Sequence, residues 1–280
     1  MLTNDYSLEI TSRDRDALVE AAPLMPAGTR VSITFLPNEE LGARVAAAQA
    51  ALDCGFVPVP HLAARHLSSE AVLEEALRSL HEIGASENIF VIAGDSPVAS
   101  GPYADALALI QSGLLERYGV RNVGIAGYPE GHPAIGNQEL SAAMRDKSMA
   151  CSARGMGCEV VTQFGFDAAA SAKWLAAVRA EGFAGTVRIG IAGPTSVKAL
   201  LRFATRCGVG ASAKVISKYG ASITKLFSTA TPDAYLTELA DKMAPSSHGE
   251  VKIHLYPFGG ISKAAHWARD HSAQLVSNAA

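Results

Sequence analysis

The chain has 280 residues, of which 49% are hydrophobic and 18% charged, and its formal net charge at pH 7 is -3. This balance gives no electrostatic reason to expect a nucleic acid or an anionic membrane as a partner. The N-terminal segment MLTNDYSLEI lacks the basic start and apolar run of a signal peptide, and no apolar stretch reaches the roughly 20 residues that span a bilayer. We therefore expect a cytoplasmic protein with no nucleic-acid or membrane partner.

In chain order, short apolar runs rich in β-branched residues alternate with segments of helical periodicity, which is typical of a parallel sheet covered by helices. Start signals for helices stand at Ser68–Glu70, at Asp167 and at Pro194–Ser196. The predicted strands are Ser7–Thr11, Arg30–Phe35, Phe56–His61, Ile89–Asp95, Asn122–Pro129, Glu159–Phe166, Thr186–Gly193 and Lys252–Phe258. The clearest predicted helices are Glu39–Leu52, Ser69–Ile83, Ala104–Arg117, Ala168–Ala180 and Ser196–Cys207.

Eight such strands predict an α/β fold, a (β/α)8 TIM barrel, with residues 1–280 as a single catalytic domain. A six-stranded doubly wound sheet is the competing fold, but it would leave two of the runs unexplained. The long segment from about Pro194 to Glu250 has room for two further helices, around Ala211–Phe227 and Pro232–Met243.

The four cysteines show no Cys-x-x-Cys spacing, which favours buried free thiols over a zinc site or a disulfide framework. They are Cys54, Cys151, Cys158 and Cys207. We predict no metal site.

Polar side chains stand at or near the ends of the first six predicted strands. In a (β/α)8 barrel these ends converge, and chemistry takes place there. Such a set is hard to explain by stability alone, so the sequence predicts a functional pocket at this end. The set comprises Glu9, Thr34, His61, Asp95, Tyr128 with Glu130 and His132, and Gln163.

Glu9 lies between Leu8 and Ile10 in the first predicted strand. If those neighbours face the outer helices, Glu9 points into the barrel, where loss of water raises the pKa of a carboxyl group and suits it to general acid catalysis near neutral pH. The alternative is that Glu9 pairs with a buried cation such as Arg188 or Lys252.

Asp95 follows Gly94, which permits a ligand to approach the backbone closely; a turn or helix-cap role for this aspartate is the alternative. Gln163 presents an amide that both donates and accepts, as the edge of a pterin or flavin ring requires. His61 is suited to a phosphate or ribose, or equally to a structural role in a loop. The sequence has no Gly-x-Gly-x-x-Gly after a strand, Walker loop, Gly-x-Ser-x-Gly or HExxH motif, which favours redox or transferase chemistry on a large heterocycle over hydrolysis.

Four stretches together resemble the methylenetetrahydrofolate reductase family. They are His61–Leu62, Ala93–Pro97, the run Gly-Tyr-Pro-Glu-Gly-His-Pro at 127–133 and the run Val-Thr-Gln-Phe-Gly-Phe-Asp at 161–167. The Tyr-Pro-Glu-Gly-His-Pro and Thr-Gln-Phe-x-Phe-Asp motifs are the specific ones, and Glu9 matches the position of the family's catalytic glutamate. The resemblance is clear from about residue 56 to 207.

The resemblance implies a cytoplasmic oxidoreductase of one-carbon metabolism and methionine biosynthesis. Such an enzyme interconverts 5,10-methylenetetrahydrofolate and 5-methyltetrahydrofolate, with hydride from NAD(P)H through FAD. Glu9 would protonate N10 as the imidazolidine ring opens, Asp95 would stabilise charge near the pterin, and Gln163 and Phe166 would bind the substrate. The positions implied for cofactor contacts are Thr34, His61, Gly94, Asp95, Tyr103, Ala104, Tyr128 and His132.

The sequence departs from the family pattern in its cations. Ala93 stands where the family commonly has arginine, and a lysine that often meets the flavin phosphates falls near Ser152, with Arg145, Lys147 or Arg154 as substitutes. The loss of two charge-assisted hydrogen bonds, at roughly 1.5–3 kcal/mol each, predicts weak FAD binding or direct hydride transfer from the nicotinamide to folate. The segment Tyr256–Gly260 also differs from the Leu-Asn usual in the family.

Three hypotheses follow. The first is the reductase acting on tetrahydrofolate derivatives, in either direction. The second is a pterin-dependent methyltransferase-like barrel, which would hold methyl-folate without redox chemistry. The third is a non-catalytic folate- or flavin-binding relative, against which Glu9 argues, because binding alone needs no inward-facing acid. NADH or NADPH, a polyglutamate preference and the oligomeric state, including a homo-oligomer, remain open.

Overall fold

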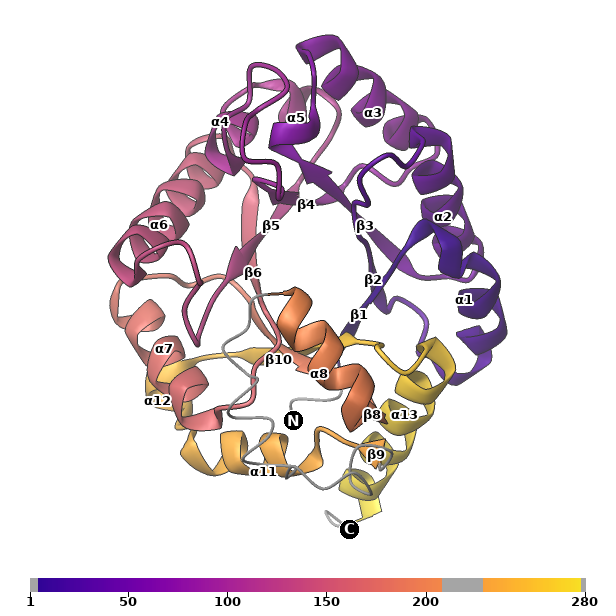
Figure 1. Ribbon diagram of the computed structural model, residues 1–280, viewed down its shortest axis with the longest axis vertical. Coiled ribbons are helices and arrows are strands. Elements are labelled where there is room, and N and C mark those ends of the chain that lie inside the picture. Colours follow the sequence, from indigo (N-terminus) through magenta and orange to yellow (C-terminus); the bar gives the residue numbers. More distant parts are fainter. Residues whose placement is uncertain (1–4, 208–228, 278–280) are drawn as a thin grey trace. The chain divides into compact units, whose positions relative to one another are not determined.

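In the computed structural model, residues 5–207 and 229–277 are described. Eight parallel strands form a closed barrel in the order β1-β10-β7-β6-β5-β4-β3-β2 (Figure 1). The predicted (β/α)8 barrel is therefore confirmed. The strands are β1 Ser7–Ile10, β2 Arg30–Ile33, β3 Val57–Ala63, β4 Asn88–Ile92, β5 Asn122–Gly127, β6 Gly157–Thr162, β7 Val187–Ala192 and β10 Val251–Tyr256.

By its internal packing the chain divides into two compact units. The first unit comprises residues 7–126 and 142–160, and the second comprises the described residues among 1–6, 127–141 and 161–280. The prediction of a single catalytic domain over residues 1–280 stays a prediction.

In the first unit, β1 to β4 and most of β5 alternate with short and long helices, and Figure 1 shows α1, α2 and α3 outside β1, β2 and β3. β1 pairs in parallel with β2, so that Glu9 stands opposite Ser32. Leu8 and Ile10 are buried, and alternation along the strand turns Glu9 to the other face. The helices are α1 Arg15–Ala21, α2 Leu41–Asp53, α3 Glu70–Glu82, α4 Ala106–Ile110, α5 Leu114–Arg117 and most of α6 Asn137–Ala153, with 3-10 turns η1 Ser12–Asp14, η2 Ala22–Leu24 and η3 Ala64–His66.

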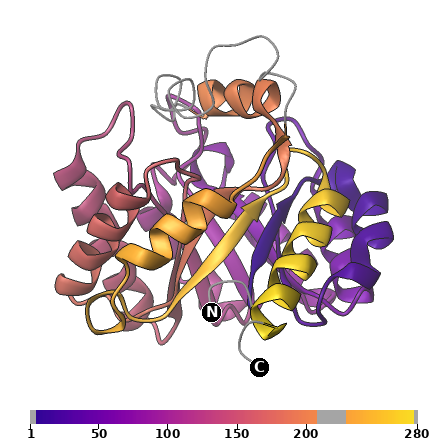
Figure 2. The ribbon, with the colours of Figure 1, turned by 90° about the horizontal axis from the view of Figure 1, so that it is seen from below.

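In the second unit, α7 packs with α11 and α12, and Figure 2 shows α8 beyond the carboxyl end of β10. A short antiparallel pair, β8 Thr195–Ser196 with β9 Thr229–Ala230, adjoins α8. The helices are α7 Ala168–Ala180, α8 Val197–Arg206, α11 Asp233–Lys242, α12 Pro245–His248 and α13 Ile261–Ser277.

The predicted helix starts are confirmed by their caps. The side chains of Ser69, Asp167 and Ser196 accept hydrogen bonds from the backbone three residues on, which satisfies amides that the first helical turn leaves unpaired.

One predicted helix was wrong in its extent. The segment Ala104–Arg117 forms two short helices, α4 and α5, because Gly113 between them takes a left-handed conformation with φ of 78°. The extra helix predicted at Pro232–Met243 is confirmed as α11, while the one at Ala211–Phe227 lies outside the described residues.

The prediction that all four thiols are buried was only partly right. The cysteines are free, but only Cys151 is fully buried, Cys54 and Cys158 are half-buried and Cys207 is exposed. Within the described part of the chain, no helix is long and apolar enough to cross a membrane.

Candidate active site

Among the acidic side chains of the first unit, Glu9 has the largest shift in pKa. Burial raises the pKa of Glu9 from an ordinary value of 4.5 to about 7, and no charged group contributes to the shift. The alternative partners are used elsewhere: Arg188 and Lys252 both form ion pairs with Asp5. Glu9 is therefore a carboxyl group that holds its proton close to neutral pH, because burial restricts its contact with water and no cation among the described residues contributes to its pKa.

Asp95 lies in the loop after β4, where its side chain is 80% exposed and faces His66, with 2.9 Å between Oδ1 and Nε2. Gly94 takes φ of 92°, and a Cβ there would lie 2.9 Å from the His66 ring. The histidine ring also packs against Phe35, which follows β2, with 4.9 Å between ring centroids. Asp95 does not cap a helix, because the next helix, α4, begins only at Ala106 and is capped by Asp105.

Sequence reasoning gave His66 and Phe35 no role in this group. The sequence shows which residue types are present. The contacts between them arise because the ends of β2, β3 and β4 lie close together, and a local sequence pattern does not reveal this. The result is an oriented carboxylate whose second oxygen remains open to solvent and to a ligand.

His61, on β3, is 6% exposed and stacks on Phe90 with ring centroids 4.6 Å apart. Burial lowers the pKa of His61 from 6.5 to about 3, so the imidazole is neutral at physiological pH. The neutral ring can donate one hydrogen bond and accept another, but it offers no positive charge to a phosphate.

Three other predicted cofactor contacts belong to the same unit. Thr34 follows β2, and its backbone N–H donates to the carbonyl of Ile10. Tyr103 is buried, and its hydroxyl has no hydrogen-bond partner among the described residues. The Ala104 carbonyl accepts a hydrogen bond from Arg65 Nε at 2.8 Å.

In the second unit, Glu130 joins the two specific motifs physically. Its Oε1 accepts hydrogen bonds from the backbone N–H groups of Phe166 and Asp167, the latter at 2.8 Å. A Cβ on Gly165 would lie 2.6 Å from the same oxygen, so glycine alone fits there without displacing the carboxylate. The Glu of the first motif therefore shapes the loop of the second, a positioning role that the sequence did not reveal.

Gln163 directly follows β6, and only the oxygen of its side-chain amide makes a hydrogen bond within the described residues. Its Oε1 accepts from the backbone N–H of Phe164 at 3.0 Å, which leaves the NH2 group without a partner among the described residues. Tyr128 and His132 form an edge-to-face pair with centroids 5.1 Å apart, and burial raises the pKa of Tyr128.

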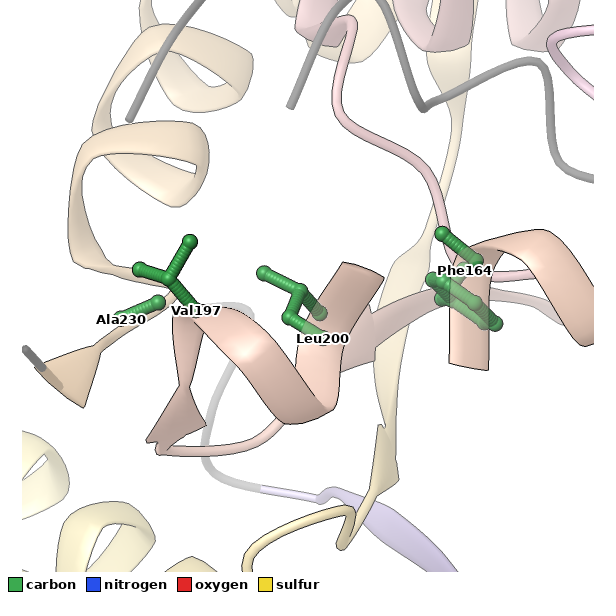
Figure 3. Packing of buried hydrophobic residues seen from close by; sticks show 5 residues of the cluster. Phe164, Val197, Leu200 and Ala230 are labelled. Carbon is green, nitrogen blue, oxygen red and sulfur yellow. The ribbon is translucent and has the colours of Figure 1, made fainter. Parts of the chain in front are cut away.

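An apolar cluster that includes Phe164, the residue after Gln163, packs against α8 and contains three of its residues. Phe164, Val197, Leu200, Ala204 and Ala230 are its buried members (Figure 3). Phe258 packs on it, with ring centroids 4.9 Å from Phe164 and 4.1 Å from Phe203. The segment Tyr256–Gly260, which departs from the family pattern, therefore contributes Phe258 to the aromatic packing against α8.

The family model for methylenetetrahydrofolate reductase matches residues 5–244. The chain belongs to the methylenetetrahydrofolate reductase family. The two specific motifs lie within this span, and the match extends well beyond the 56–207 in which the resemblance was clear from sequence.

Among solved structures, the chain is similar to a Clostridium thermocellum protein described as binding two copies of 5-methyl-5,6,7,8-tetrahydrofolic acid. The identity is 11%, the TM-score 0.63, and the match covers 99% of this chain and 95% of that one. Dihydropteroate synthase from Thermus thermophilus matches at 16% identity and a TM-score of 0.53, again over 99% and 95% of the two chains. At these identities the likeness supports the fold alone.

Of the three cations that the sequence offered for the flavin phosphates, Arg145 is exposed and Arg154 is engaged elsewhere. Arg154 forms an ion pair with Glu116 at 3.1 Å and also donates to a backbone carbonyl. Lys147 is half-buried near Asp105, and burial lowers its pKa. Arg65, a further cation that the sequence analysis did not offer, donates from Nε and Nη1 to carbonyls of the loop that follows β4. Arg154 and Arg65 thus reach a flavin pyrophosphate only by giving up these contacts.

Proposed function

We propose that this chain is an oxidoreductase that interconverts 5,10-methylenetetrahydrofolate and 5-methyltetrahydrofolate, with NAD(P)H as the hydride donor. Membership of the methylenetetrahydrofolate reductase family supports the substrate class. The observation that carries the proposal is Glu9, a carboxyl group whose pKa is raised to about 7 by burial alone. A binding protein would gain nothing from such a group, whereas a general acid that works near neutral pH requires it.

In this proposal Glu9 delivers its proton to N10 of the substrate as the imidazolidine ring opens. The C–N10 bond breaks, its electron pair takes the proton, and the exocyclic carbon is left as an iminium. Hydride from the reduced nicotinamide then adds to that carbon and gives the methyl group. In the reverse direction Glu9 accepts the proton back, for which a pKa near the working pH is again suitable.

The other predicted residues have binding roles in this proposal. Asp95 stabilises the positive charge of the iminium, and His66 sets the direction of its carboxylate. The unpaired NH2 group of Gln163 donates to the pterin, and Phe166 covers one side of the substrate. The remaining predicted cofactor contacts are Thr34, His61, Gly94, Tyr103, Ala104, Tyr128 and His132.

Whether FAD is a resident cofactor is tested by the visible absorption spectrum of the purified protein, before and after addition of excess FAD and desalting. Because Arg154 and Arg65 are engaged elsewhere, we expect no flavin bands to survive desalting. Retained flavin would show that other residues hold the phosphates and would place the cofactor in the reaction.

A pterin-dependent methyl-transfer barrel is the second candidate function. It is favoured by the likeness to a protein described as binding 5-methyltetrahydrofolic acid, a ligand that such a barrel would hold without redox chemistry. Oxidation of NADH or NADPH that depends on 5,10-methylenetetrahydrofolate separates the two functions, since methyl transfer consumes no nicotinamide.

The deciding experiment measures that oxidation for the wild-type protein, for Glu9→Gln and for Glu20→Gln, an exposed glutamate of α1 that serves as the matched control. We expect Glu9→Gln to lower kcat by about 10²–10⁴-fold with little change in folate binding, as loss of a general acid does. Glu20→Gln should match the wild type. Folate binding without nicotinamide oxidation in the wild type would overturn the reductase and favour the second candidate.

A further inference from the structure

Two of the four cysteines are in contact in the first unit. Cys151 lies in the last turn of α6, and Cys158 is the second residue of β6. Each thiol has the other as a side-chain hydrogen-bond partner. Both cysteines are free, and Cys151 is fully buried whereas Cys158 is half-buried. The proposed function gives this pair no role.

The turn between α6 and β6 brings the two residues together. The backbone N–H groups of Arg154 and Met156 both donate to the carbonyl of Cys151 at 3.0 Å, and Gly155 between them has a φ of 70°. A glycine in the left-handed region is a common way to end a helix. The helix therefore ends just beyond Cys151, and the chain reverses at once into β6.

Alternation along β6 turns Cys158 toward the helix layer. The next residue, Glu159, forms an ion pair with Arg30 of β2 at 3.1 Å, although β2 and β6 are not neighbours in the sheet. This contact crosses the interior of the barrel, so the adjacent Cys158 faces the opposite side. Figure 1 shows α6 on that side, outside β5 and β6. Cys158 thus meets Cys151 between the strand and the helix.

The surroundings of the pair favour a thiolate. The hydrogen bond from Cys158 lowers the pKa of Cys151, and burial opposes it. Among the charged neighbours of Cys151, Arg154 and Lys147 lower its pKa and Glu116 raises it. Donation of the same hydrogen bond raises the pKa of Cys158. The pair therefore gives up one proton more easily than a lone buried thiol does and keeps the other between its two sulfurs.

We propose that Cys151 and Cys158 are a peroxide-reactive dithiol, a modification site at which hydrogen peroxide converts the pair into a reversible disulfide. The mutual contact of the thiols and the access of solvent to Cys158 support this assignment. Sulfurs in hydrogen-bond contact can reach bonding distance by side-chain rotation, without the backbone movement that widely separated cysteines require. The inference lies outside the proposed function, because neither thiol takes part in the folate reaction.

Two steps carry out the oxidation. The pair releases one proton to solvent, and transfer of the remaining proton to Cys151 leaves Cys158 as the thiolate that peroxide reaches. Its sulfur attacks one peroxide oxygen, the O–O bond breaks, and the leaving hydroxide takes the proton from Cys151, which gives water and a sulfenic acid on Cys158. The Cys151 thiolate then attacks that sulfur, the S–S bond forms, the S–O bond breaks, and the hydroxide that leaves takes up the proton released at the start. Two thiols are oxidised, and the peroxide is reduced to two molecules of water.

The test is oxidation of the folded full chain with hydrogen peroxide, followed by alkylation of the remaining thiols in denaturant and digestion with trypsin. Trypsin cuts after Lys147 and Arg154, so Cys151 and Cys158 fall in different peptides, residues 148–154 and 155–173. We expect these two peptides to be recovered joined, with the loss of two hydrogen atoms in mass. Treatment with dithiothreitol before alkylation should separate them and restore both thiols.

The other two cysteines provide the controls. The pKa of Cys54 is raised by burial and by Asp53, so this thiol should still be alkylated at the peroxide concentration that joins the pair. Cys207 is exposed, and Cys207→Ser should form the link as the wild type does. Cys158→Ser should form no link and should leave Cys151 open to alkylation.

The wild-type protein alone decides the outcome, so the folding of a variant does not limit the test. Recovery of the two peptides apart and alkylated overturns the inference. Oxidation of either thiol that dithiothreitol does not reverse, or a link that forms only through Cys207, overturns it as well. The readout is a covalent bond and not turnover, so its failure leaves the proposed function standing, and failure of the folate reaction leaves this result unchanged.

Discussion

Replacing Glu9 by glutamine tests whether the pKa of Glu9 is higher in the folded protein than in the unfolded chain. Each tenfold change in an ionisation constant is worth about 1.4 kcal/mol. A rise in the pKa of Glu9 from 4.5 to about 7 therefore means that ionisation costs the folded state about 3 kcal/mol. This is an upper value, because the residue is half-buried and keeps some contact with water.

The sign of the pH dependence follows from proton binding. Between pH 4.5 and about 7 the unfolded chain has lost the proton of Glu9 and the folded protein still holds it. Stability from this group is therefore complete below pH 4.5, falls as the pH rises through that window, and is lost above about 7. Glutamine has a similar shape and cannot ionise, so Glu9→Gln removes this slope.

The assay is urea unfolding of the wild type and of Glu9→Gln at several pH values from about 4.5 to 8, with the free energy of unfolding extrapolated to water. We expect the difference between the two proteins to change by up to about 3 kcal/mol across the window, with the variant gaining relative to the wild type as the pH rises. Parallel curves would refute the raised pKa, and with it the main argument that Glu9 is a general acid. Glu20→Gln should run parallel to the wild type.

Three other results are expected. Gly94→Ala should lower the free energy of unfolding by about 2–3 kcal/mol, because residue 94 has a φ of 92° and the added Cβ would collide with His66. The control Gly55→Ala has a φ of 76° but no atom near the added Cβ, and it should lower the free energy of unfolding by about 1 kcal/mol. Equal losses in the two variants would contradict the contact with His66. The ring nitrogens of His61 should show no titration by NMR between about pH 5 and 8, since its pKa is lowered to about 3, and a titrating ring would mean that it is hydrated. Glu130→Ala should lower the free energy of unfolding by about 3 kcal/mol, because it removes two hydrogen bonds to a charged acceptor. A free energy of unfolding equal to that of the wild type would show that the loop keeps its shape without these hydrogen bonds.

The strands could be predicted from sequence because each is a short apolar run bounded by turn signals. All eight are found within a few residues of their predicted limits, and α7 has its predicted bounds of Ala168–Ala180. Two of the helices that were not predicted, α1 and α6, lack a strong local signal. α1 has only seven residues, and most of α6 is polar or small, so neither produces a long apolar stripe.

The residues of the candidate site could be proposed from the sequence one at a time, but the contacts between them could not. Counting strand ends found Glu9, Asp95 and Gln163, because a polar group there interrupts an apolar pattern. It could not find that His66 orients Asp95, or that Glu130 accepts from the amides beside Phe166, since these contacts join residues 29 and 36 positions apart. Only the fold determines which loops meet.

Arg188 and Lys252 each form an ion pair with Asp5. These pairs show that the position of a residue along its strand determines its ionic partner more than its residue type does. Each is the second residue of its strand, near the amino end, and both pair with Asp5, which precedes β1. Glu9 is the third of four residues in β1 and therefore lies nearer the carboxyl end. No cation contributes to the pKa of Glu9, whereas Asp5 is stabilised in its ionised form by Arg188 and Lys252. The proton of Glu9 is held by burial, and a proton held in that way can be given to a ligand without first breaking an ion pair.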